Sequence, residues 1–109
     1  MIYNNFLDLM RDFIDDKIDA NTYQTYFFKL LHEDIFFDKH YDVMQNLFYD
    51  VEEYCADKNL KGDNEIDENK LKNSTIHALK LLLKENLNER DLKIARDIID
   101  DINKVLRDE

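Results

Sequence analysis

The clearest signal for the fold is the stretch FLDLMRDFIDDKIDANTY, which occupies residues 6–23. Its apolar residues recur at intervals of three or four, the spacing that places side chains on one face of an α-helix. The face of this first helix consists of Phe6, Leu9, Met10, Phe13 and Ile14. Asn4 or Asn5 is positioned to cap the helix, and the polar run at residues 16–19 predicts a tight turn before a second helix.

Four further helices are expected, because the same spacing continues along the chain. Their expected N-caps are Asp19, Asp38, Asp67 and Asn88, and Asp91 gives the last one a form like a capping box. The apolar faces consist of Tyr23, Tyr26, Phe27, Leu30, Leu31 and Phe36; of Tyr41, Met44, Leu47, Phe48, Val51, Tyr54 and Cys55; of Leu71, Ile76, Leu79, Leu82 and Leu83; and of Leu92, Ala95, Ile98, Ile99, Ile102, Val105 and Leu106. Residues 57–66 break the pattern and form one longer loop.

The composition supports the same fold class. The chain has no proline and a single glycine, Gly62, and both residues are avoided inside helices and common in turns. Short connections between consecutive helices favour antiparallel neighbours. We therefore expect an all-α fold, an antiparallel four-helix bundle with an additional C-terminal helix. A chain of 109 residues is expected to form one domain over residues 1–109, with 88–109 as the extra helix.

Charge and aromatic residues are concentrated in the first half of the chain. The formal net charge is −10, and residues 1–57 carry 13 acidic against 4 basic side chains, whereas residues 58–109 carry 12 against 11. All 13 aromatic residues fall between Tyr3 and Tyr54. Direct nucleic-acid binding is disfavoured, because phosphate contacts need clustered Lys and Arg. An acidic face instead attracts a basic partner and speeds encounter with it.

The sequence also suggests a compartment. Cys55 is the single cysteine, which rules out an intramolecular disulfide and fits a reducing environment. The first residues lack the basic and apolar regions of a signal peptide. No stretch approaches the roughly 18 apolar residues of a membrane span. We expect a cytoplasmic protein with no membrane partner.

The loop residues 57–68 have the length of a calcium-binding EF-hand loop. Lys61, however, places an ammonium group where a carboxylate ligand is required, and Asn64 replaces an aliphatic residue. A solvated acidic connector that ends in a helix cap explains the loop better. The three histidines, His32, His40 and His77, do not form a zinc-ligand pattern. No metal or other cofactor is expected.

No set of residues supports catalysis. A phosphate-binding loop cannot be built with one glycine, and Ser74, the only serine, lies mid-helix beside Thr75. Adjacent carboxylates are abundant, but general acid–base work needs them in a cleft with shifted pKa values. In a chain this acidic, solvated helix faces account for them. We expect no catalytic residue and no enzymatic activity.

An acidic stripe on the third predicted helix has two interpretations. Its members, at spacings of three or four, are Asp42, Asn46, Asp50, Glu53 and Asp57. Asp63 and Glu65 extend the negative charge into the loop, and Tyr49 is expected to be exposed within it. Helices normally carry charge outward, so the stripe fits a solvated face. An aromatic residue among carboxylates also fits an interface anchor, and the two readings remain open at this point.

Three segments resemble the colicin D-type immunity proteins, which protect bacteria against colicins and contact-dependent inhibition toxins. The step Lys17-Ile-Asp-Ala20 with Tyr23 is similar to the family's junction between the first two helices. Residues 47–55 are similar to its "F-x-D-V-x-x-Y/F" third helix, and residues 65–71 to its "I-D/S-E-x-x-L" entry into the fourth. The resemblance covers roughly residues 6–85, in the family's order and spacing, and leaves the last helix outside.

The resemblance implies a specific function, in which an acidic surface blocks the active site of a toxin's nuclease domain. The family's targets are tRNA-cleaving, and the basic C-terminal domain of such a toxin is the expected partner. The residues that the third-helix motif and its loop assign to toxin contact are Asp50, Glu52, Glu53, Asp57, Asp63 and Glu65. The free protein is expected to be a monomer or a weak dimer. The alternative is an acidic helical adaptor or regulatory module that binds another cellular protein.

Overall fold

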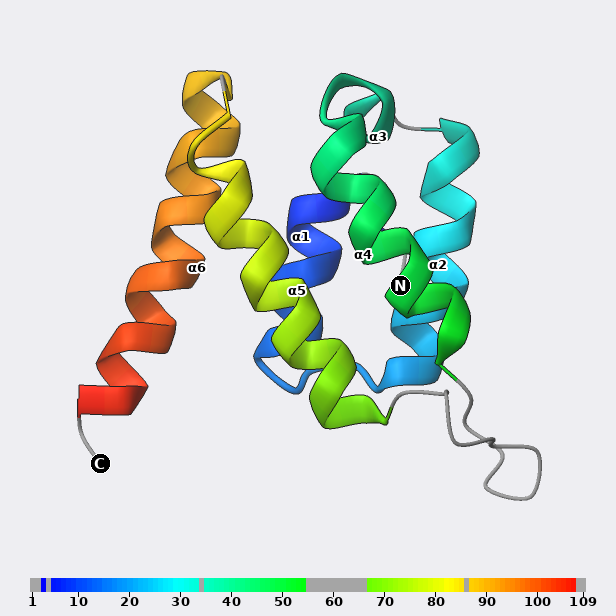
Figure 1. Cartoon of the computed structure of the whole chain (residues 1–109). Helices are drawn as coiled ribbons and strands as arrows, with labels where there is room; N and C mark the ends of the chain where they lie inside the picture. Colours follow the sequence, from blue (N-terminus) through cyan, green and yellow to red (C-terminus); the bar gives the residue numbers. More distant parts are fainter. Residues whose placement is uncertain (1–2, 4, 34, 55–66, 86, 108–109) are drawn as a thin grey trace.

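The computed structural model describes residues 3, 5–33, 35–54, 67–85 and 87–107, and these form helices and turns without a strand. The helices are α1 (Phe6–Ile14), α2 (Ala20–Glu33), α3 (Phe36–Lys39), α4 (Tyr41–Glu53), α5 (Glu68–Leu82) and α6 (Glu89–Arg107) (Figure 1). None of the described helices combines the length and apolar character that would let it cross a membrane.

Four of these helices form a bundle. In it α1 packs on α2, α2 on α4, α4 on α5, and α5 on α1, which closes the ring. Consecutive long helices run in opposite directions (Figure 1). The expected antiparallel four-helix bundle is therefore confirmed. Short connections explain the arrangement, because a chain that turns within a few residues must place the next helix beside the last one.

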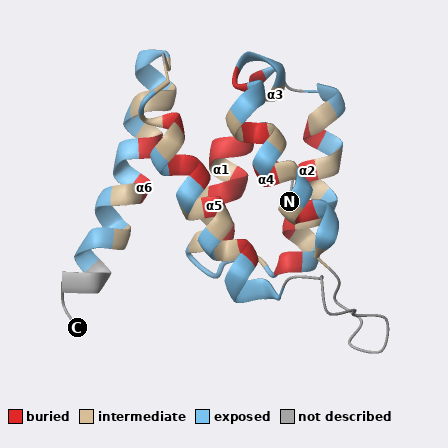
Figure 2. Cartoon of the chain, viewed as in Figure 1, coloured by how far each residue is buried: buried red, intermediate tan, exposed pale blue. Residues whose placement is uncertain are grey.

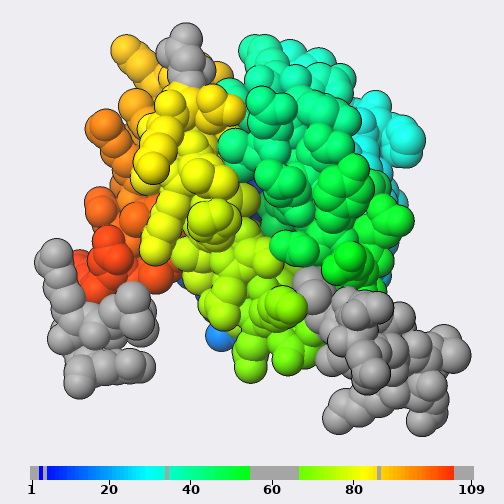
Figure 3. Space-filling model, viewed as in Figure 1, coloured from blue at the N-terminus to red at the C-terminus, as the bar shows by residue number. Residues whose placement is uncertain are grey.

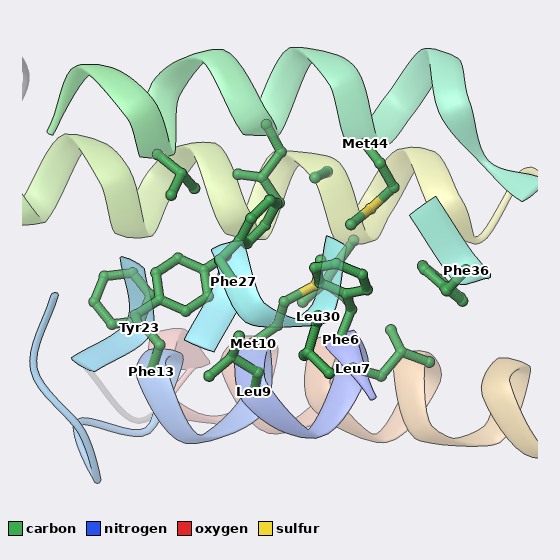
Figure 4. Packing of buried hydrophobic residues seen from close by; sticks show 14 of the residues in the cluster. Phe6, Leu7, Leu9, Met10, Phe13, Tyr23, Phe27, Leu30, Phe36 and Met44 are labelled. Atoms are coloured by element: carbon green, nitrogen blue, oxygen red, sulfur yellow. The ribbon is translucent and has the colours of Figure 1, made fainter. Parts of the chain in front are cut away.

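The bundle interior is a single hydrophobic core. Figure 2 shows its buried residues on the inner faces of the helices, and Figure 4 shows side chains of α1, α2, α3 and α4 meeting between the helices. The largest fully buried side chains are Tyr23, Phe6, Phe13, Phe27, Leu7, Leu9, Met10, Leu30, Met44, Leu47, Leu71 and Leu79. Phe13 stacks on Tyr23 at 4.2 Å between ring centroids, and Phe6 meets Phe27 edge-on at 4.9 Å. Such ring pairs add to the free energy gained by burial alone.

Local hydrogen bonds start four of the helices as the sequence predicts. The side chains of Asn5, Asp19, Asp67 and Asn88 each accept a hydrogen bond of 2.8 Å from the backbone N–H three residues later. Each bond satisfies one of the N–H groups that a helix start leaves without an intrahelical partner. The predicted turn at residues 16–19 lies between α1 and α2.

The predicted cap of the third helix is wrong. Asp38 lies inside a short separate helix, α3, and α4 begins after His40, whose side chain makes no capping hydrogen bond. The cause is tertiary packing, because Phe36 is buried 6.2 Å from the ring of Phe6 and 4.7 Å from that of His40. Phe37 packs against Phe48 on α4 at 6.1 Å. The chain turns so that both rings can reach the core.

Several predicted apolar faces also need correction. On α5 the buried residues are Leu71, Thr75, Ala78, Leu79 and Leu82. Ile76 and Leu83 are only partly buried. Leu7 is buried because α1 is covered by α2, α5 and α6. Tyr41, expected on the apolar face of α4, is instead 49% exposed. Cys55 and the side chains of Val105 and Leu106 lie outside the described part of the chain.

The C-terminal helix packs against the four-helix bundle. α6 packs on α1 and α5, where it buries Ala95 and Ile98. Arg11 on α1 lies 3.9 Å from Asp101 on α6, so an exposed ion pair joins the two helices as well. The sequence left open whether this helix packs on its own bundle or on a second copy, and its apolar face is directed at its own bundle.

Candidate binding surface

The acidic stripe lies on α4, the helix that packs between α2 and α5 in the bundle. Figure 3 shows α4 and α5 side by side on one face of the molecule. Met44, Leu47 and Val51 are buried and fix the rotation of α4 about its axis. Because a helix turns 100° per residue, this rotation directs the stripe away from the core.

The structure describes three of the six predicted contact residues. Glu52 and Glu53 are exposed, and Asp50, one turn earlier, is half-buried on the side of α4 that faces α5. Asp42 and Asn46 are exposed on the preceding turns. Asp57, Asp63 and Glu65 lie outside the described residues. The three described carboxylates thus belong to the last turns of one helix.

None of these carboxylates forms an ion pair with another described residue. Within residues 3–54, 67–85 and 87–104, leaving out positions 4 and 34, the ion pairs are Arg11–Asp101 and Lys72–Asp16. Neither pair includes an acidic residue of α4. An unpaired carboxylate keeps its negative potential available at the surface, where a basic partner can meet it.

A cleft of about 400 Å³ lies at the surface between α4 and α5. One wall carries Asn46 and Asp50, and the opposite wall carries Lys70, Asn73 and His77. Leu47, Ala78 and Leu81 line the cleft between these polar groups, so it combines an apolar floor with polar side chains from both helices. Asp50 is therefore placed where an interface on α4 would continue towards α5.

The end of α4 is held by a residue that sequence reasoning missed. The side-chain amide of Gln24 on α2 donates hydrogen bonds to the carbonyl oxygens of Val51, at 2.9 Å, and Tyr54, at 3.1 Å. The last carbonyls of a helix have no intrahelical partner, so Gln24 stabilises the turn that carries Glu52 and Glu53. No local sequence pattern could reveal this role, because Gln24 is 27 residues from Val51 and 30 residues from Tyr54.

Two exposed tyrosines lie on α4, and an exposed isoleucine precedes α3. Among the described residues, the large hydrophobic side chains with high exposure are Ile35 at 65%, Tyr41 at 49% and Tyr49 at 50%. The exposure of Tyr49 confirms the prediction made from its place in the acidic stripe. The phenol oxygen of Tyr49 accepts a hydrogen bond of 2.8 Å from the Gln45 side chain one turn earlier.

The structural surroundings of Tyr23, Tyr3 and Asp19 shift their pKa values. Burial raises the pKa of Tyr23, and burial together with a hydrogen bond to Asp12 raises the pKa of Tyr3. The pKa of Asp19 is lowered, chiefly because it accepts the backbone hydrogen bond of Thr22. In the described part of the chain, no three His, Cys, Asp or Glu side chains come together in a way that could hold a metal ion. Residues 57–66 of the EF-hand-length loop lie outside that part.

Comparison with known proteins identifies the family. The family described as "Bacterial self-protective colicin-like immunity" matches residues 1–82. The chain belongs to the colicin-like immunity proteins. No curated protein and no solved structure matches it. The resemblance found in the sequence is thereby confirmed. The matched region ends with α5, and α6 lies outside it.

Membership of this family defines the general activity of the protein. An immunity protein protects the bacterium that makes it by binding a cognate toxin, so this chain is an inhibitor and not an enzyme. The acidic face of α4 lies within the matched region, as does the exposed Tyr49. These residues are consequently candidates for contact with the toxin.

Proposed function

We propose that this immunity protein neutralises a tRNA-cleaving nuclease toxin by covering the active site of its C-terminal domain. The observation that carries the proposal is the acidic face of α4, whose carboxylates form no ion pair with another described residue, in a protein of the colicin-like immunity family. The contact surface comprises Asp50, Glu52 and Glu53, and it continues through Asp57, Asp63 and Glu65, which follow α4 in the sequence.

The physical basis is competition with the phosphate backbone of the substrate. A nuclease that grips tRNA must present Lys and Arg side chains to phosphates. A row of carboxylates on a rigid helix can occupy the same positions and exclude the RNA. The net charge of −10 also steers the inhibitor towards a basic domain, which raises the association rate at low ionic strength.

Compartment and assembly follow from this role. Because tRNA is a cytoplasmic substrate, the inhibitor acts in the cytoplasm. We further propose that the free protein is a monomer or a weak dimer, since α6 directs its apolar face at its own bundle and leaves α4 accessible.

The test is a charge reversal with a matched control. The toxin domain is taken from the large protein encoded immediately upstream, and its cleavage of total tRNA is measured with and without one equivalent of inhibitor. Glu52→Lys with Glu53→Lys should slow association about tenfold or more at low salt, because steering depends on local potential. Added salt should reduce the difference.

The control is Asp97→Lys with Asp100→Lys, which changes net charge equally but on exposed positions of α6. This pair should slow association much less. Equal effects of the two pairs would show that only net charge matters and would refute the α4 surface. Uninhibited cleavage in the presence of the unmodified protein would refute the nuclease target itself.

A further inference from the structure

The exposed ring of Tyr49 has a defined setting on α4. Its neighbours at the i+3 and i+4 positions are Glu52 and Glu53, which share its side of the helix. Helical side chains lean towards the N-terminus, so both glutamates extend back towards the ring. Single exposed apolar residues are ordinary on a protein surface, but an exposed ring flanked by two carboxylates is a specific combination.

The ring is also held in place before any partner binds. Gln45 donates a hydrogen bond of 2.8 Å to the phenol oxygen of Tyr49, and the ring of Phe48 lies 6.1 Å away at an interplanar angle of 57°. Phe48 is in turn fixed by edge-on contacts with Phe28 and Phe37. A pre-oriented ring loses little conformational entropy when a partner covers it.

The protein places its own cations over other rings. The ammonium group of Lys29 lies 5.2 Å from the ring centroid of Tyr26, and that of Lys72 lies 5.6 Å from that of Phe13. Among the residues that the structure describes, no cation lies over Tyr49. The Tyr49 ring is therefore available for a cation–π contact with a group from another molecule.

We propose that Tyr49, Glu52 and Glu53 form an arginine-binding platform for a basic protein partner. The guanidinium plane stacks on the Tyr49 ring, while its N–H groups donate to the two carboxylates. Arginine fits better than lysine, because its planar fork can stack and donate at the same time, whereas the lysine ammonium is a compact and strongly hydrated charge. This inference rests on the proposed function and names the toxin side chain that the α4 surface receives.

The test compares substitutions of the two exposed tyrosines in toxin binding. Tyr49→Leu keeps an apolar side chain but removes the π face, and it should weaken toxin affinity about 30-fold, the scale of an interface hot spot. Tyr49→Phe keeps the face and should stay within about threefold of the unmodified protein. Tyr41→Leu is the matched control, since Tyr41 has nearly the same exposure but Met44 and Gln45 at i+3 and i+4. It should change affinity little.

A second measurement does not depend on the toxin. The unmodified protein is titrated with hexa-arginine and with hexalysine peptides, and the ring resonances of Tyr49 are followed by NMR. Larger shifts with hexa-arginine, lost in Glu52→Gln with Glu53→Gln, are the expected result. Equal shifts with both peptides, or none at Tyr49, would overturn the platform. If the toxin domain fails to bind while the peptide response persists, the nuclease target is wrong and the platform stands.

Discussion

Asp16 ends α1 in a backbone conformation that usually belongs to glycine. Its φ is 63°, in the left-handed region, and the N–H groups of Asp16 and Lys17 bond to the carbonyls of Phe13 and Asp12. This pair of bonds is a Schellman motif, which closes the helix. Aspartate tolerates the conformation better than most residues, whereas a β-branched side chain does not.

Substitutions at this residue should separate backbone strain from charge. Asp16→Val should lower the free energy of unfolding by about 2 kcal/mol, because valine is strained at positive φ. Asp16→Asn removes the negative charge that pairs with Lys72 but keeps a side chain suited to the turn, so it should cost less than about 1 kcal/mol. Urea denaturation measures both values. Equal losses in the two variants would show that the ion pair, not the backbone, determines stability here.

Tyr23 gives the protein a dependence on alkaline pH. Its hydroxyl donates to Thr75 Oγ1 at 3.0 Å, and Thr75 donates to the Leu71 carbonyl. Burial raises the pKa of Tyr23 above its ordinary value of 10.0. The unfolded chain therefore loses this proton first as pH rises, so the stabilising contribution is complete below pH 10 and declines above it.

The corresponding measurement is thermal unfolding at pH 8, 10 and 11. Tyr23→Phe should cost about 1 kcal/mol at pH 8, the net value of a buried hydrogen bond. Above pH 10 the variant should lose stability less steeply than the unmodified protein. The stability of the variant will still decline above pH 10, since the raised pKa of Tyr3 contributes in the same direction. Parallel curves for the two proteins would contradict the assignment to Tyr23.

At the scale of the element, α4 depends on α2 for its last turn. Gln24→Ala removes both hydrogen bonds to the Val51 and Tyr54 carbonyls and should cost about 1–2 kcal/mol. Amide hydrogen exchange should become faster in the last turn of α4 and remain unchanged at its start. Toxin affinity should fall several-fold, because Glu52 and Glu53 are no longer held in one position. Thr25→Ala, on the exposed side of α2, is the control, and similar exchange in both variants would exclude the Gln24 contact.

The helices also show which features can be predicted from sequence. Caps at Asn5, Asp19, Asp67 and Asn88 were predictable, because each is a bond between residues three apart. The start of α4 was not, because it depends on rings brought together by the fold. The acidic face of α4 was visible in its spacing, whereas its support from Gln24 comes from a distant segment. Thr75 and Ala78 lie four and seven residues after Leu71, so helical spacing could have placed both on the buried face of α5.

At the scale of the molecule, α6 packs on the bundle away from the proposed toxin-binding surface on α4. α6 lies outside the region matched by the family, and it packs on α1 and α5. In Figure 1, α5 separates it from α4. We therefore expect α6 to stabilise the bundle without contacting the toxin, so stability and affinity should respond to different substitutions.

Ile98 is the residue at which this separation is best measured. It is buried against the bundle, and Ile98→Ala should lower the free energy of unfolding by about 2–4 kcal/mol through lost burial and the cavity left behind. Toxin affinity, measured well below the melting temperature, should remain unchanged, because the remaining folded population presents the same α4 surface. Glu52→Lys with Glu53→Lys should give the opposite result, with weak binding and nearly unchanged stability. A loss of affinity in Ile98→Ala at temperatures where the protein is fully folded would mean that α6 also shapes the toxin-binding surface.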